Sequence, residues 1–196
     1  MVDKIIITAL QDEANPIIDF YNLARDIKQP DLKVYSNDKY SLLVTGVGRN
    51  KVIDTLPIYL NRIYSRNSIL INVGIAGGNP SSTKIGNIYY IERLNSDFFK
   101  KEYVFPETEN ILIPKIGLTT VEKNINKNDN NLYKELVDME AAAITHIAIK
   151  YFDLSKIKIL KIVSDYMNIV DWSNLNIKKF IQSNIDSISY LINQNE

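Results

Sequence analysis

The sequence predicts a layered α/β fold around a mostly parallel or mixed sheet. Short runs rich in isoleucine, leucine and valine alternate along the chain with longer amphipathic segments, which is the pattern of strands and helices taking turns in one sheet. Several of the short runs end on glycine or on an acid. No internal repeat and no linker-like stretch interrupts the alternation, so we expect one domain over residues 1–196.

The first half of the chain opens with "KIIITAL", a β-branched run ended by polar residues and typical of a buried strand. In the next segment Asp12 is placed to cap a helix, and Pro57 marks an irregularity in a second helix. The glycines of "GIAGG" end the most strand-like run. In chain order we expect a strand at 4–10, a helix at 12–27, strands at 32–36 and 40–48, a helix at 49–66 and a strand at 68–78.

The second half continues the alternation after a polar, irregular stretch at 94–110. The stretch at 122–131 is rich in asparagine and predicts a loop or a lid. The apolar, alanine-rich run "LVDMEAAAITHIA" predicts one helix of about 15 residues. The expected elements are strands at 87–93 and 111–121, a helix at 136–148, a strand at 156–165 and an amphipathic helix at 176–194.

Composition excludes several classes of function. Lys+Arg and Asp+Glu are both 23, so no bulk charge favours nucleic acid as a partner. The chain has no cysteine and a single histidine, His146, which argues against disulfides, thiolate or histidine metal sites and a cysteine nucleophile. No run approaches the roughly 20 apolar residues that span a bilayer, and the N-terminal run is too short for a secretory signal. We therefore expect a soluble cytoplasmic protein without a metal, a cofactor or a membrane partner.

Polar residues at the ends of three strands predict a ligand site. In α/β sheets ligands bind beyond the carboxyl ends of the strands, where Glu13, "GIAGG" and the Ser164–Asp165 pair are expected. Each signal alone has a plain structural explanation. Glu13 suits the first turn of a helix, an aspartate after a strand is usually a turn residue, and the glycine pattern matches neither the phosphate loop nor the dinucleotide fingerprint.

The acids of the 136–148 segment are less easily explained. Asp138 is adequately explained by the favourable dipole at a helix N-terminus. Glu140 is flanked by small alanines that predict close packing, and a buried carboxylate requires hydroxyl or amide donors, such as a sugar diol. His146 lies on a different face of the helix from Glu140, and we interpret it as structural.

Five segments in order resemble the superfamily of nucleoside phosphorylases and 5′-methylthioadenosine/S-adenosylhomocysteine nucleosidases. The segments are "ITALQDEANPI", "VTGVGRNKV", "INVGIAGG" with "KIGNIYYIER", "VDMEAAAITHIA" and "LKIVSDYMN", and together they span most of the chain. The resemblance implies a three-layer αβα sandwich around a mixed sheet. It also implies a small-molecule nucleoside substrate, a place in methionine salvage and a homodimer.

The resemblance gives the acids their tasks. Asp165 matches the general acid that protonates the departing purine, and Glu13 matches the acid that positions or deprotonates the attacking water. Glu140 matches the carboxylate that binds the ribose hydroxyls, and Met139 matches the residue that packs on the sugar.

Five more positions in these motifs are expected to contact substrate. They are Asp138, Lys161, Ser164, Gly77 and Ile75. Lys161 stands where nucleosidases usually have an arginine near the water, and Ile75 replaces a small hydroxyl residue. The expected reaction is hydrolysis of the N-glycosidic bond of 5′-methylthioadenosine, S-adenosylhomocysteine or a related modified nucleoside, of which a futalosine-type compound is one. Asp12 and Glu13 would repel phosphate, yet phosphorolysis stays an alternative, as does a non-catalytic nucleoside-binding protein on the same scaffold.

Overall fold

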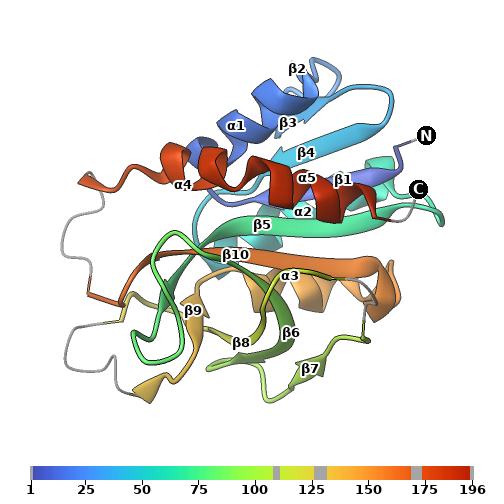
Figure 1. The fold of residues 1–196 in the computed structure, drawn as a ribbon. Helices are drawn as coiled ribbons and strands as arrows, with labels where there is room; N and C mark the ends of the chain where they lie inside the picture. Colours follow the sequence, from blue (N-terminus) through green and yellow to red (C-terminus); the bar gives the residue numbers. More distant parts are fainter. Residues whose placement is uncertain (1, 108–110, 126–131, 169–173, 195–196) are drawn as a thin grey trace.

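The computed structural model describes residues 2–107, 111–125, 132–168 and 174–194 (Figure 1). The strands are β1 (Lys4–Thr8), β2 (Ala24–Arg25), β3 (Lys33–Ser36), β4 (Tyr40–Val44), β5 (Ile69–Gly78), β6 (Ile88–Ser96), β7 (Tyr103–Val104), β8 (Lys115–Thr120), β9 (Leu136–Asp138) and β10 (Ile157–Asp165). The helices are α1 (Gln11–Tyr21), α2 (Arg49–Ile63), α3 (Ala141–Ala148), α4 (Ile177–Ser183) and α5 (Ile185–Asn193), with a 3-10 turn at Leu154–Lys156.

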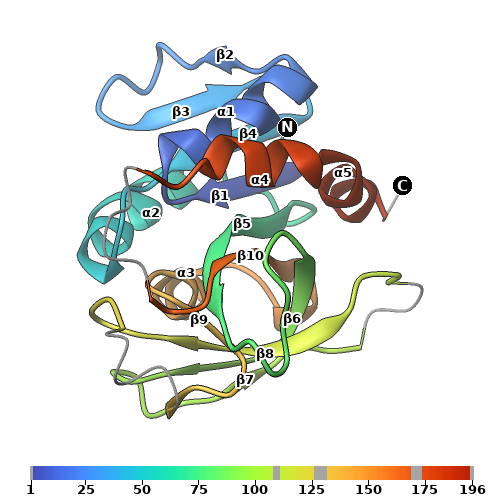
Figure 2. The ribbon, with the colours of Figure 1, turned by 60° about the vertical axis from the view of Figure 1, so that its left-hand side comes forward.

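One sheet joins all the strands, and half of it closes on itself. The strand order is β10-β6-β8-β9-β5-β1-β4-β3-β2, with β7 beside β6, and β10 also pairs with β5. The second pairing of β10 makes a closed ring of β10, β6, β8, β9 and β5, while β1 to β4 continue as an open sheet. Figure 2 looks toward the ring, with β5 and β10 on its upper side and β8 below.

The predicted α/β class and mixed sheet are confirmed, with two corrections. Five of the ten strand pairings in the described residues are parallel, so the sheet is mixed but not mostly parallel. An open three-layer sandwich describes only the part around β1 and β4, because the other part of the sheet curls into the ring. The strands predicted from apolar runs all form, whereas the short β2, β7 and β9 were not predicted.

Alternating side chains of β1 divide the core between the two faces of the sheet. Ile6 packs in a cluster with residues of α1, α4 and α5, whereas Ile5 and Ile7 pack with residues of α2 and α3. Figure 1 shows α4 and α5 crossing in front of the sheet and α3 behind it. A strand buried on both faces has a continuous run of apolar residues in the sequence. This is why "KIIIT" shows no alternation of apolar and polar residues.

The segment 136–148 is not one helix, and this prediction was wrong. Leu136 to Asp138 form β9, which pairs antiparallel with the end of β5 and parallel with β8. Helix α3 begins only at Ala141, and Glu140 is its N-cap residue with φ −129°. Apolar periodicity cannot distinguish a buried strand followed by a short helix from one long helix.

Two other helix boundaries differ from the expectation. Asp12 does not cap α1; the Glu13 carboxylate reaches back and accepts the N–H groups of Ala9 and Leu10. The expected helix at 176–194 is two helices that meet at Asn184, whose side-chain amide donates to the Gly86 and Phe180 carbonyls. No helix in the described part of the chain is long and apolar enough to cross a membrane. Much of the expected loop at 122–131 lies outside the described residues.

Closure of the ring requires a glycine at the end of β5. A Cβ atom at Gly78 would lie 2.2 Å from Thr83 Oγ1 and 2.9 Å from Val163 Cγ1. We expect Gly78→Ala to lower the free energy of unfolding by about 1–3 kcal/mol, because both neighbours are buried and the added methyl group would overlap them. Urea unfolding measures the loss. Adding Thr83→Ala should recover part of it, and an unchanged or larger loss in the double variant would show that the Thr83 contact is not its source.

Candidate active site

A cavity of about 590 Å³ opens at the carboxyl ends of the parallel strands β1, β5 and β10. This is the end of a sheet at which α/β proteins bind ligands, and the volume suits a small organic molecule. Its wall is predominantly apolar with a few carboxylates. The lining residues are Ala9, Leu10, Glu13, Val47, Ile75, Ala76, Gly77, Val121, Glu122, Lys123, Asn124, Ile125, Val137, Asp138, Met139, Glu140, Ser164, Asp165, Met167 and Ile177.

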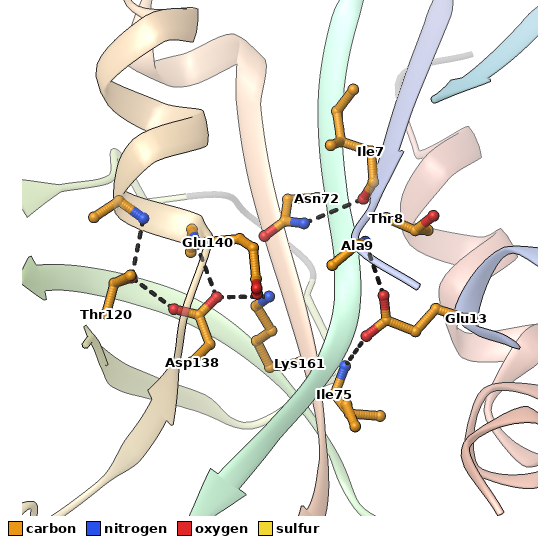
Figure 3. Close-up of polar contacts among 12 residues, drawn as sticks. Ile7, Thr8, Ala9, Glu13, Asn72, Ile75, Thr120, Asp138, Glu140 and Lys161 are labelled. Atoms are coloured by element: carbon orange, nitrogen blue, oxygen red, sulfur yellow. Dashed lines mark hydrogen bonds and ion pairs between the residues drawn. The ribbon is translucent and has the colours of Figure 1, made fainter. Parts of the chain in front are cut away.

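Glu13 is held at the β1 side of the cavity by three backbone donors. Its Oε2 accepts the N–H groups of Ala9 and Leu10, each at 2.9 Å, and its Oε1 accepts the Ile75 N–H at 2.9 Å (Figure 3). Burial raises the pKa of Glu13, while the Lys161 cation and these N–H groups oppose the rise. Three N–H donors therefore fix the orientation of the Glu13 carboxylate.

Lys161 and Asp138 form an almost completely buried ion pair. The Lys161 Nζ lies 2.8 Å from Asp138 Oδ2, and the two side chains are 2% and 1% exposed. Asp138 Oδ2 also accepts the Ala141 N–H at the start of α3, and Oδ1 accepts the Thr120 hydroxyl at 2.6 Å. Thr120 Oγ1 in turn accepts the Ala142 N–H. The pair thus joins β10, β9, β8 and the N-terminus of α3 at one point (Figure 3).

Glu140 faces the cavity from the N-cap of α3. Its Oε1 accepts the Gly48 N–H at 2.6 Å, a donor that comes from the loop before α2. Gly48 has φ +88°, in the region that favours glycine, so the loop presents its N–H without strain. Burial and the nearby Asp138 carboxylate raise the pKa of Glu140 to about 8, against the opposing effects of Lys161 and the Gly48 N–H. Near neutral pH this carboxyl exchanges readily between its protonated and ionised forms.

Asp165 lies on the cavity wall at the end of β10. Its Oδ2 accepts the Ser164 hydroxyl at 2.6 Å, and its Oδ1 accepts the Met167 N–H at 2.7 Å. An irregularity in the pairing with β5 between Val163 and Asp165 directs the strand end toward the cavity. Met167 has φ +56°, which is uncommon for a side chain of this size, and marks a tight turn held by the Asp165 carboxylate.

The structure brings eight of the nine predicted site residues onto the cavity wall. They are Glu13, Ile75, Gly77, Asp138, Met139, Glu140, Ser164 and Asp165. Lys161 is not on the wall but behind it, beneath the carboxylates. His146 lies elsewhere: its ring stacks on Phe99 and its Nδ1 meets the Tyr103 hydroxyl at 3.1 Å.

Sequence reasoning missed several residues of the wall. Leu10 and Val47 add apolar surface next to Glu13 and Glu140, and Met167 packs over Gly77, where a Cβ atom would lie 3.0 Å from its Cγ. The glycine pair that flanks Val47 was the available signal for a backbone donor. In the described ranges no group of three or more histidine, cysteine, aspartate or glutamate side chains is arranged to hold a metal ion.

Comparisons with known proteins place the fold. The structure is similar to that of a mutant of the Helicobacter pylori 5′-methylthioadenosine/S-adenosylhomocysteine nucleosidase with 5′-methylthioadenosine in its active site, with TM-score 0.81, 12% identity and 99% of each chain covered. The nucleosidase of Streptococcus pneumoniae with a transition-state inhibitor gives TM-score 0.79 at 14% identity and covers both chains in full, at 100%.

The futalosine hydrolase of H. pylori gives TM-score 0.80 at 14% identity, with 99% of each chain covered. No protein-family model and no curated protein sequence matches the chain. The chain therefore has the fold of these nucleosidases along its whole length.

The proton on Glu140 makes stability depend on pH. Its pKa is about 8 in the folded protein, against a usual value of 4.5, so the folded state holds the extra proton between these values. The contribution of this proton to the free energy of unfolding is therefore complete below about pH 4.5. It decreases between pH 4.5 and pH 8, by up to about 1.4 kcal/mol per pH unit. Calorimetry between pH 5.5 and 8 should show a steeper fall for the wild type than for Glu140→Gln, which still accepts from Gly48. Equal slopes would contradict this assignment.

Proposed function

We propose that the chain is a nucleosidase that hydrolyses the N-glycosidic bond of a purine nucleoside. The observation that carries the proposal is the convergence of Glu13, Glu140 and Asp165, from three separate elements, on one cavity. The fold relatives named above include nucleosidases and a futalosine hydrolase. The proposed substrates are 5′-methylthioadenosine, S-adenosylhomocysteine or a related modified nucleoside, and the proposed pathway role is methionine salvage.

The three carboxyl groups match the charges that develop in this reaction. Breaking the bond builds positive charge on the sugar and negative charge on the base, as in glycoside hydrolysis. Asp165 would act as the general acid that delivers a proton to the purine ring as the base departs. Glu140 would accept the ribose hydroxyls, and Glu13 would orient and deprotonate the attacking water. Met139 lies on the wall beside Glu140, where its thioether would pack on the sugar.

Water suits this cavity better than phosphate as the nucleophile. Among the described residues of the wall, Lys123 is the one cation, and it is exposed at the end of β8. Glu13, which acts as an ionised base in this proposal, lies on the same wall and would repel a phosphate dianion. Lys161, the buried cation nearby, is already engaged by Asp138.

A non-catalytic nucleoside-binding protein is the second candidate, and Ile75 is the observation that favours it. The Ile75 side chain on the wall offers no hydroxyl to an attacking water. Its N–H nevertheless donates to Glu13, so the orientation of the proposed base does not depend on that hydroxyl. We therefore place hydrolysis first.

The proposal includes a cytoplasmic homodimer. Helix α2 buries Val52 and Leu56 in the core, while Ile53 and Ile58 are 47% and 42% exposed. Exposed aliphatic side chains on a helix suit an interface with a second copy. Val47, 49% exposed at the cavity, lies just before the same helix, so such an interface would adjoin the site.

Replacement of Asp165 tests the acid. We expect Asp165→Asn to lower turnover of 5′-methylthioadenosine at least about 100-fold with a modest change in affinity, because an amide keeps the shape but cannot donate the proton. Steady-state kinetics give the first quantity and titration calorimetry the second. Ser164→Ala is the matched control, since it keeps the Asp165 carboxyl and removes the neighbouring hydroxyl, which donates to Asp165 and to the Ala76 carbonyl. A loss below about tenfold for Asp165→Asn would remove Asp165 from the acid role.

Base release tests the reaction itself. Purified protein incubated with 5′-methylthioadenosine should yield free adenine on chromatography at the same rate with and without phosphate. Release that requires phosphate would identify a phosphorylase instead. If the nucleoside binds in calorimetry but no base appears, the binding-protein candidate replaces the nucleosidase.

A further inference from the structure

The buried pair of Lys161 and Asp138 is not explained by fold stability alone. Removing two charges from water costs several kcal/mol each, and the attraction between them in a buried site roughly repays that cost. Apolar side chains of similar size would therefore fill the same space without loss. Both side chains are 2% exposed or less, so neither relieves the cost by reaching solvent. We therefore expect the pair to have a role in the neighbouring cavity.

Lys161 lies where its cation interacts with three carboxylates of the cavity wall, those of Asp138, Glu140 and Glu13. Gly74 lies directly opposite it on β5, and a Cβ atom there would be 2.8 Å from Glu13 Oε1 and 3.4 Å from Lys161 Nζ. The missing side chain at Gly74 thus lets the carboxylate and the ammonium group approach. On the far side, the Lys161 cation interacts with Glu140 as well as with Asp138.

Asp138 is the residue that fixes this cation. Its carboxylate has three partners: the Thr120 hydroxyl, the Ala141 N–H and the Lys161 ammonium group. An ionised carboxylate has about four acceptor positions, so little capacity remains for a substrate hydroxyl. Because β8 and the start of α3 also hold Asp138, the carboxylate cannot follow a displaced lysine.

We infer that Asp138 is a positioning residue, which holds the Lys161 ammonium group between Glu13 and Glu140 so that Glu13 remains an ionised base beside the cavity. The inference rests on the proposed function for the catalytic role of Glu13, although the charge arrangement itself is independent of it. Lys161 then acts from behind the wall by its charge and not by contact with the substrate. Asp138 acts only through Lys161.

The charged groups around Lys161 give the direction of the effect. They are Glu13 on α1, Asp138 on β9 and Glu140 at the N-cap of α3. Burial raises the pKa of Glu13 and the Lys161 cation lowers it. Loss or displacement of the cation should therefore raise the pKa of Glu13 further, by about 1–3 units for a charge at this range.

Carbon-13 NMR of the full chain with labelled glutamate carboxyl groups measures that pKa without any reaction. The Glu13 signal is assigned by its absence in Glu13→Gln. We expect the Glu13 pKa to rise by at least about one unit in Asp138→Asn and in Lys161→Met, and to stay near the wild-type value in Lys161→Arg. The double variant Asp138→Asn/Lys161→Met should equal Lys161→Met alone, because Asp138 has no other route to Glu13.

Two outcomes would overturn the inference. One is an unchanged Glu13 pKa in Lys161→Met, and the other is a further rise when Asp138→Asn is added to it. Ile144→Ala, in the core on α3, is the control for destabilisation: it should lower the melting temperature and leave the Glu13 pKa unchanged. The double variant removes both charges of the pair and so leaves neither of them buried alone. It can still be compared with Lys161→Met if Asp138→Asn alone does not fold.

Kinetics separate this inference from the proposed function. If the chain is a nucleosidase, the acid limb of kcat/KM should move to higher pH in Asp138→Asn by the same amount as the NMR pKa, with KM changed less than kcat. If the Glu13 pKa rises in Asp138→Asn but the wild type releases no base, the positioning role stands and the nucleosidase proposal is refuted. If the wild type releases base but neither the acid limb nor the Glu13 pKa moves in Asp138→Asn, the nucleosidase proposal stands and the positioning role is refuted.

Discussion

A single buried cation, Lys161, lies among the carboxylates at the carboxyl ends of the parallel strands, and the arrangement of the site depends on it. Asp138, Glu140 and Glu13 are each under 10% exposed, and without a cation near them repulsion and desolvation would favour their protonated forms. The fold meets this constraint by directing backbone N–H groups at the carboxylates from the starts of α1, α2 and α3.

The closed half of the sheet is what brings these groups together. Strand β10 pairs with β5 on one side and with β6 on the other. This pairing places Lys161, at the middle of β10, opposite Gly74 on β5. Strand β9 inserts between β5 and β8 and ends on Asp138, so that α3 starts at the wall of the cavity. Strand pairing therefore sets much of the backbone of the site, and loops supply the N–H groups of Ala9, Leu10 and Gly48 together with part of the rim.

Similarity of fold to known nucleosidases does not by itself determine the reaction, and the wall of this cavity has its own character. Val121, Val137 and Met167 form a small apolar cluster together with Ile125 and Met139. Thioethers adapt to ligands of varied shape, so this part of the wall can adjust to the ligand that it contacts.

The sequence alone determined the α/β class, the seven principal strands and the acids at the strand ends, because continuous β-branched runs and strand-end polarity are local patterns. It could not show that residues 136–148 divide into β9 and α3, since the partners that make β9 a strand, β5 and β8, are distant in sequence. Nor could it pair Lys161 with Asp138, or supply Glu140 with the N–H of Gly48, 92 residues away. Those contacts exist only once the ring has closed, because burial in three dimensions, and not local propensity, decides which charges must find partners.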